Sequence, residues 1–271
     1  MSSHAAFEPL HGAEGQPTPV LRHGDTVLRP AAPWTPTVHA LLDHLEQVGF
    51  TGSPRVVGDG YDDQGREVVT YVEGEFVHPH AWSDEGVHAA GRLLRRLHDA
   101  TSSFTPPDGA VWQRWPFHSD APDAIISHRD AGPWHTVARG GMPVAYIDWT
   151  TAGPTDRLDE VAGAAWWNAQ LHDDDIAERH GLPDAESRAG QLRLFLDGYG
   201  LSGEDRRGFV TRMIEYAVRD CAAVAIEERI TPESGDTAPG PGHAVWALAW
   251  RARSAAWMLR HRPILERAVT G

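Results

Sequence analysis

The first third of the chain alternates apolar and polar residues in short runs. Residues 19–22 and 26–29 alternate on either side of a turn that contains Gly24, a pattern that predicts a β-hairpin. Trp-Thr-Pro at 34–36 predicts the start of a helix with Thr35 as its N-cap, and Gly49 marks its end. Strand-like runs follow at 55–58 and 67–72. The expected order is therefore strand, strand, helix, strand, strand.

After Glu-Gly-Glu at residues 73–75 the pattern takes on a helical period. Apolar residues line one side of the segment 84–100, which predicts a long amphipathic helix. A short strand at 124–127 and a hairpin over 136–147 interrupt the helical pattern, and three or four helices are expected from residue 158 onward. We therefore expect two parts, residues 1–73 with a small sheet and residues 74–271 with mainly helices.

Composition narrows the classes of partner. The chain of 271 residues carries 24 basic and 38 acidic side chains, a net charge of −14, which disfavours nucleic acid and anionic membranes as partners. No apolar run is long enough to span a membrane. The single cysteine, Cys221, suits the reducing cytoplasm, which is the predicted location. Every basic side chain is arginine, so any step that usually needs lysine falls to arginine here.

Two aspartates follow short strands near the middle of the chain. His128-Arg129-Asp130 comes directly after the strand at 124–127, and Asp148 comes directly after the second strand of the following hairpin. One carboxylate so placed can accept the proton of an attacking hydroxyl. The other can hold Mg²⁺ against the phosphates of a nucleotide. The pair therefore predicts a centre for phosphoryl transfer.

At these residues the chain resembles the aminoglycoside phosphotransferase family of kinase-like enzymes, whose catalytic loop reads His-x-Asp, then Asn, then Ile-Asp-Trp. The resemblance extends over nearly the whole chain. It implies an α+β, two-lobed protein-kinase-like fold, with a small antiparallel-sheet lobe (1–73) for the nucleotide and a larger, mainly helical lobe (74–271) for catalysis and substrate. It also implies Asp130 as the catalytic base, His128 as a brace of the loop and Asp148 as the main metal ligand. The implied reaction transfers the γ-phosphoryl group of ATP or GTP, with Mg²⁺, to a hydroxyl of a small molecule.

Three positions depart from the pattern of that family. His135 stands where an asparagine would bind the metal, and a neutral imidazole serves Mg²⁺ poorly. Either one metal site is weakened, a softer ion such as Mn²⁺ is used, or His135 has another role. Arg29 takes the place of the lysine that grips the nucleotide phosphates, and Glu46 on the next helix is its expected ion-pair partner. The loop expected to cover the phosphates holds only two glycines, Gly12 and Gly15, and an acidic residue, which makes a poor phosphate cradle.

These departures leave three hypotheses open. The chain is a small-molecule phosphotransferase, a catalytically degenerate kinase-fold binding protein, or a kinase-like enzyme that acts on a peptide hydroxyl in a biosynthetic pathway. Acidic side chains of the C-terminal part would suit a cationic amino-sugar as acceptor: Asp197, Glu215, Asp220, Glu227 and Glu228. Trp246, Trp250 and Trp257 lie near one helical face, which favours packing in the core over a ligand site.

Overall fold

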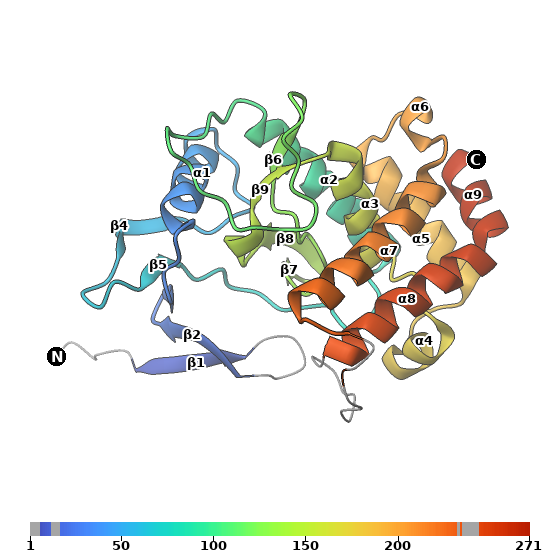
Figure 1. Cartoon of the computed structure of the whole chain (residues 1–271), viewed down its shortest axis with the longest axis horizontal. Coiled ribbons are helices and arrows are strands. Elements are labelled where there is room, and N and C mark those ends of the chain that lie inside the picture. The colour runs from blue at the N-terminus through green and yellow to red at the C-terminus, as the bar shows by residue number, and fades with distance from the viewer. Residues whose placement is uncertain (1–5, 12–16, 232–233, 235–243) are drawn as a thin grey trace.

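The computed structural model describes residues 6–11, 17–231, 234 and 244–271. These residues form a small lobe built around a sheet, blue to cyan in Figure 1, and a larger lobe built mainly of helices, teal through green and yellow to red. The expected two-lobed α+β fold is confirmed. The exact boundary between residues 73 and 74 stays a prediction.

The small lobe holds a five-stranded antiparallel sheet in the order β1-β2-β3-β5-β4. Its elements are β1 (Phe7–His11), β2 (Pro17–His23), β3 (Thr26–Arg29), α1 (Thr35–Gln47), β4 (Val56–Tyr61) and β5 (Glu67–Thr70). The predicted hairpin is β2–β3, and Gly24 takes a φ of 59° in its turn. The sequence did not predict strand β1, because its five residues include a proline and show little apolar alternation.

Helix α1 buries the apolar face that its pattern predicts: Val38, Leu41, Leu42 and Leu45. Its N-cap is Trp34 rather than the expected Thr35. Thr35 lies inside the first turn, where its hydroxyl accepts the backbone N–H of Ala32. Gly49, with a φ of 79°, follows the helix as expected and turns the chain toward β4.

The larger lobe begins with α2 (Asp84–Thr101) and continues with more helices than the sequence predicts. They are α3 (Arg157–Asn168), α4 (Asp174–His180), α5 (Ala185–Tyr199), α6 (Gly203–Arg206), α7 (Phe209–Glu227), α8 (Ala244–Arg260) and α9 (Arg262–Thr270). Gly181 and Gly200, both at positive φ, end helices that the apolar pattern alone runs together. Within the described residues, no helix is long and apolar enough to cross a membrane.

Helices α2 and α5 form the closest helix pair of the larger lobe. At their crossing, a Cβ on Gly91 would lie 2.0 Å from the carbonyl oxygen of Phe195, and a Cβ on Gly198 would lie 2.0 Å from that of His88. Only glycine permits the two backbones to approach this far. The close crossing fixes α2 as a rigid support beneath the central strands.

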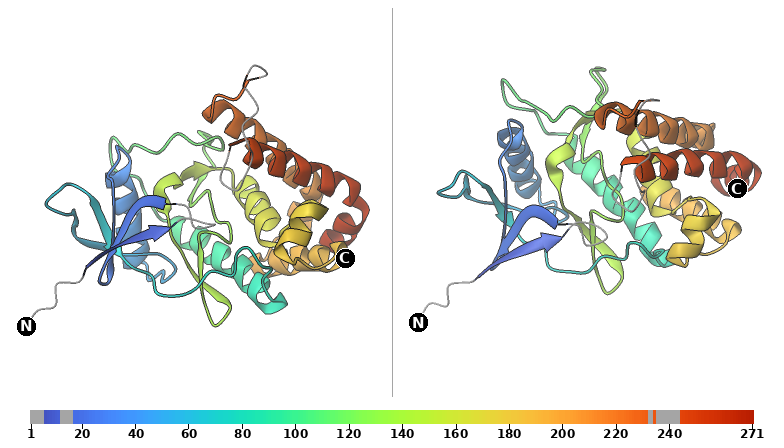
Figure 2. Two further views of the ribbon diagram at one scale, coloured as in Figure 1. Left: turned by 90° about the horizontal axis from the view of Figure 1, so that it is seen from below. Right: turned by 60° about the horizontal axis from the view of Figure 1, so that its bottom comes forward.

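Short strands between the two lobes position the candidate site. Strand β6 (Ile125–Ser127) pairs with β9 (Gly153–Thr155), and β7 (Thr136–Arg139) pairs with β8 (Met142–Tyr146). Figure 2 shows these strands between the sheet of the small lobe and the helices of the larger one. The loop 128–135 joins β6 to β7, and Asp148 follows β8 at the start of a short 3₁₀ turn. Both predicted aspartates therefore lie where the lobes meet.

Candidate active site

The carboxylate of Asp130 is held in place by Trp134 and His135. Its Oδ1 accepts the indole N–H of Trp134 at 3.2 Å, and its Oδ2 lies 3.3 Å from Nδ1 of His135. The side chain is 17% exposed, so an incoming group can still reach it. Burial would raise the pKa of Asp130, but the positive charge of His135 outweighs it and holds the pKa below its usual value. The carboxylate is therefore ionised and held in a fixed orientation.

His128 lies beneath the loop and is completely buried. Its Nδ1 accepts the backbone N–H of Asp130 at 3.3 Å, so its Nε2 carries the proton and donates to the carbonyl of Ile147 at 2.9 Å. Burial lowers the pKa of His128 to about 4, which keeps the ring neutral. This arrangement ties the loop that holds Asp130 to the strand that leads to Asp148, which is the bracing geometry expected of His128.

Arg129 anchors the same loop from below. It takes a φ of 64°, and its buried guanidinium donates to three backbone carbonyls, those of Gln113, Thr151 and Ala152. Its backbone N–H donates to the carboxylate of Glu160 at 2.9 Å. Arg129 is thus a structural anchor, because its side chain is used for hydrogen bonds to the backbone.

Asp148 is held by groups from both lobes. Its Oδ1 accepts from Nη1 of Arg29 at 2.7 Å and from the hydroxyl of Thr150 at 2.6 Å. Its Oδ2 lies 3.6 Å from Nε2 of His135. Burial would raise the pKa of Asp148, but the charges of His135 and Arg29 outweigh it and place the pKa far below its usual value.

His135 therefore lies between the two carboxylates, one on each ring nitrogen. Burial would lower the pKa of His135, but Asp130 and then Asp148 outweigh it and raise the pKa to about 9. At neutral pH the ring is an imidazolium that donates to Asp130 from Nδ1 and attracts Asp148 by charge from Nε2. The sequence places a histidine at this position but gives no sign that its side chain carries a positive charge.

This donor set does not fit a divalent metal ion as it stands. A protonated imidazole has no free lone pair for a metal, and Oδ1 of Asp148 is already engaged by Arg29. Among the described residues, no group of three or more His, Cys, Asp or Glu side chains has an arrangement that could hold a metal. The expectation of Mg²⁺ or Mn²⁺ at Asp148 and His135 stays a prediction.

The ion pair expected between Arg29 and Glu46 is not formed. Arg29 pairs instead with Glu67, which lies directly opposite it in the β3–β5 ladder and is 2% exposed. Glu46 lies 3.5 Å from Arg55, near the end of α1. A cross-strand neighbour on a buried face is closer than a residue one helix away, and the linear sequence hides this pairing because α1 and β4 intervene. Gly12 and Gly15 lie outside the described residues.

Comparison with known proteins assigns the chain to a family. No family model matches it. It is 51% identical over 257 residues to the trifolitoxin immunity protein of Rhizobium leguminosarum bv. trifolii. The aligned region covers 94% of this chain and 96% of that protein. The chain belongs to the family of this immunity protein.

Solved structures place this member of the immunity-protein family in the kinase-like fold. A microcompartment-associated aminopropanol kinase matches with a TM-score of 0.62 at 15% identity, over 99% of this chain and 96% of the other. Choline kinase LicA from Streptococcus pneumoniae matches with a TM-score of 0.53 at 14% identity, over 91% and 94%. A GDP complex of aminoglycoside 2′-phosphotransferase-IIIa matches with a TM-score of 0.52 at 13% identity, over 98% and 93%. The expected likeness to aminoglycoside phosphotransferases is confirmed for the fold.

A buried polar network supports the loop and was missed by sequence reasoning. The hydroxyl of Ser127 donates to Glu160 at 3.0 Å and lies 3.1 Å from Nε2 of His98. The other nitrogen of His98 lies 2.9 Å from the hydroxyl of Tyr199 on α5. Burial raises the pKa of Glu160 to about 7. These residues come from four separate elements, so no local pattern could have grouped them.

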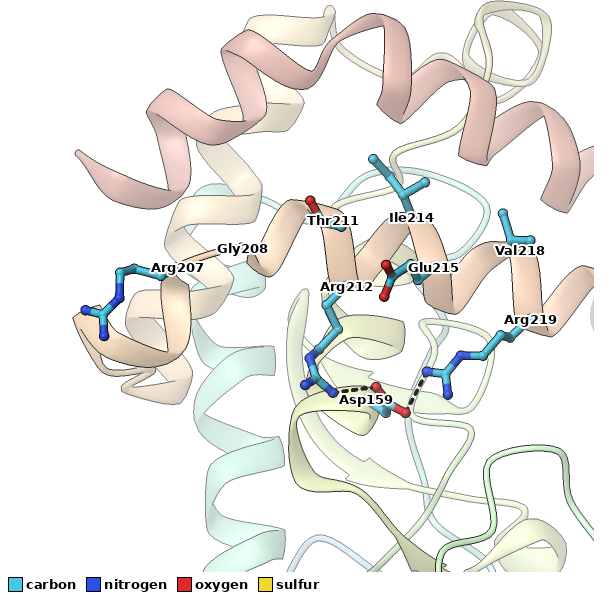
Figure 3. Close-up of a pocket in the computed structure, with 9 residues that line it drawn as sticks. All are labelled: Asp159, Arg207, Gly208, Thr211, Arg212, Ile214, Glu215, Val218 and Arg219. Atoms are coloured by element: carbon cyan, nitrogen blue, oxygen red, sulfur yellow. Dashed lines mark hydrogen bonds and ion pairs between the residues drawn. The ribbon is translucent and has the colours of Figure 1, made fainter.

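Some of the acidic residues expected to bind a cationic acceptor form ion pairs with arginines of this chain. Asp197 pairs with Arg206 and Asp220 pairs with Arg251, each at 2.6 Å. Glu215 lines an open groove of about 660 Å³ along α7, which Figure 3 shows. In that groove Arg212 and Arg219 both point at Asp159, at 2.7 and 2.6 Å. Neither Asp130 nor Asp148 lines this groove.

Proposed function

We propose that the chain is a kinase-like phosphotransferase that protects a cell from a toxin. It transfers the γ-phosphoryl group of ATP or GTP to a hydroxyl of a small molecule, with Asp130 as the base. The observation that carries the proposal is the carboxylate of Asp130, ionised, partly exposed and fixed by Trp134 and His135 at the junction of the lobes. The kinase-like fold supports the reaction type, and the name of the 51% identical relative supports the role in immunity.

The chemistry needs few groups. The acceptor hydroxyl donates a hydrogen bond to Asp130, its oxygen forms the new bond to phosphorus, and the bond to the leaving diphosphate breaks. The proton passes to Asp130. Arg29 and His135 place two positive charges beside Asp148 and so reduce the negative charge that the phosphates would meet there. Arginine can bind phosphate oxygens in pairs, so the missing lysine does not remove this function.

A second function, protection by binding without catalysis, is favoured by the same ion pairs. Arg29 and His135 already neutralise the two carboxylates that a metal–nucleotide complex would otherwise engage. A protein of this kind would protect by holding the toxin. The two functions differ in whether Asp130 must be a carboxylate.

The test combines survival with product analysis. A strain sensitive to trifolitoxin, the toxin in the name of the 51% identical relative, is made to express the wild-type chain, Asp130→Asn or the control Asp123→Asn. Asp123 is an exposed aspartate on the preceding loop. Catalysis predicts that wild type and Asp123→Asn protect, that Asp130→Asn loses protection at least tenfold, and that purified protein transfers labelled phosphate from ATP or GTP to the toxin.

Equal protection by Asp130→Asn and wild type would rule out the catalytic proposal and favour binding. Isosteric asparagine keeps the hydrogen bond from Trp134, so the fold of the loop is expected to survive. A circular dichroism melt of each variant verifies this. A labelled peptide product would instead point to the peptide-hydroxyl hypothesis.

A further inference from the structure

Arg29 is held by two carboxylates that differ in their access to solvent. Its Nε donates to Glu67, whose side chain is 2% exposed. Its Nη1 donates at 2.7 Å to Asp148, whose side chain is 47% exposed, and at 2.8 Å to the hydroxyl of Thr150. The third nitrogen, Nη2, takes part in none of these contacts. A phosphate that arrives from solvent can therefore reach the Asp148 side of the guanidinium but not the buried Glu67 side.

Glu67 is itself fixed by the sheet and by α1. It lies directly opposite Arg29 in the β3–β5 ladder, so backbone pairing holds the two residues side by side. Its Oε1 lies 3.1 Å from Nε2 of His39 on α1. The ring of His39 packs against that of Tyr61, and a Cβ on Gly60 would lie only 2.5 Å from it. The tightly packed ring of His39 thus holds the carboxylate of Glu67 in one orientation.

The two carboxylates also differ in how readily they can give up Arg29. Burial would raise the pKa of Glu67, but the hydrogen bonds from His39 and Arg29 outweigh it and lower the pKa, so the carboxylate is ionised at neutral pH. Breaking the pair of Arg29 and Glu67 would leave a buried charge without a partner, which is strongly unfavourable. The bond to Asp148 is exposed, and another anion can replace it with little loss of free energy.

We propose that Glu67 is a positioning residue that holds Arg29 by Nε, while Nη1 passes from Asp148 to a phosphate oxygen of the bound nucleotide. His39 supports Glu67 in this role. The role rests on the proposed function, because it concerns the phosphates of the nucleotide that donates the phosphoryl group. The sequence suggested Glu46 on α1 as the partner of Arg29, whereas the structure assigns that position to a residue of the sheet.

ATP and adenosine are titrated into the full chain, without acceptor and without added metal, and binding is followed by ligand-observed NMR. GTP and guanosine are titrated in parallel. The nucleoside lacks phosphates, so its affinity reports on the rest of the nucleotide site. Glu67→Ala should weaken binding of the nucleotide at least fivefold, because the guanidinium loses its buried anchor and turns to Asp148. It should leave the dissociation constant of the nucleoside within twofold of wild type.

Glu46→Ala is the matched control, because Glu46 pairs with Arg55 and should not affect binding of nucleotide or nucleoside. Glu67→Gln keeps the shape of the side chain but not its charge, and it serves if Glu67→Ala does not fold. It should weaken nucleotide binding at least threefold. Asp148→Asn should bind the metal-free nucleotide at least threefold more tightly than wild type, because Arg29 is released to the phosphates.

Equal or tighter nucleotide binding by the Glu67 variants would overturn the positioning role and show that the charge of Glu67 only repels the phosphates. Parallel loss of nucleotide and nucleoside binding would show a general structural role instead. A loss with Glu46→Ala would return the role to α1. Saturable nucleotide binding without phosphoryl transfer would count against the proposed function alone, whereas no nucleotide binding by wild type would remove both.

Discussion

Replacing His135 with asparagine tests the charge balance of the site most directly. The substitution removes the imidazolium that lies between Asp130 and Asp148 and restores the amide found in the resembled family. It leaves two carboxylates with one fewer positive neighbour. We expect a less stable protein at neutral pH and a stronger response to divalent metal.

The magnitude follows from the pKa of His135, raised from 6.5 to about 9 by folding. A raised pKa in the folded state means that the proton's contribution to stability is fully present below pH 6.5 and is lost as the pH rises through 9. The two pKa values correspond to a contribution of about 2–3 kcal/mol at pH 7 that has nearly vanished at pH 9. Wild type should therefore lose about 2 kcal/mol between these two pH values.

Urea denaturation of wild type and His135→Asn at pH 6, 7, 8 and 9 measures this loss. The free energy of unfolding of the variant should be about 2 kcal/mol lower at pH 7 and approach that of wild type at pH 9. Glu160 has a pKa of about 7, so its titration affects the free energy of unfolding mainly below pH 7 and contributes little to the change between pH 7 and 9. His118→Asn, which alters an exposed histidine beside Asp120, serves as the control.

Parallel curves for wild type and His135→Asn between pH 7 and 9 would refute the assignment of a protonated His135. A second measurement adds MgCl₂ and ATP and follows the melting temperature. The metal-dependent increase should be larger for His135→Asn than for wild type, because the amide oxygen offers a ligand that the imidazolium lacks. An equal increase would show that His135 does not oppose the metal.

Four further substitutions test the support of the site and the packing beneath it. Arg129→Met removes the donors to three buried carbonyls, and urea denaturation should show a loss of about 3–6 kcal/mol. Gly91→Ala forces a Cβ against the backbone of Phe195 and should destabilise by about 1–3 kcal/mol, whereas Gly190→Ala, with open space at its Cβ, should stabilise by up to about 1 kcal/mol in the same assay. Glu160→Gln, which cannot ionise, should match wild type below pH 4.5; as wild type loses stability while the pH rises through 7, the variant should become more stable than wild type, by up to about 3 kcal/mol at pH 8.

Local patterns predicted the parts of the site that lie close together in the chain. His128 and Asp130 share one loop, and Asp148 follows the next hairpin, so strand signals and spacing alone place them at one junction. The periodicity of α1 and α2 likewise follows from apolar residues within each helix. In each case the determining contacts are local, which is why the sequence suffices.

The groups that set the charge of the site come together only through tertiary pairing. Glu67 faces Arg29 because β5 inserts beside β3, after a helix and another strand have intervened. The predicted ion pair between Arg29 and Glu46 was wrong, because proximity along the chain is a poor guide to neighbours across a sheet. Trp250 packs against the core, as the sequence indicates, and only the placement of α8 brings it beside Trp134 of the loop 128–135.

These pairings give a physical reason for the two departures from the resembled family. The site holds three carboxylates, Glu67, Asp130 and Asp148, and two cations, Arg29 and His135, which leaves one net negative charge. With a neutral residue at position 135 the remainder would be two negative charges, which a divalent cation would balance. His135 supplies half of that charge from the protein itself and so weakens the electrostatic demand for a metal. A site of this kind depends less on metal concentration and more on pH, and the expected loss of stability between pH 7 and 9 is its direct consequence.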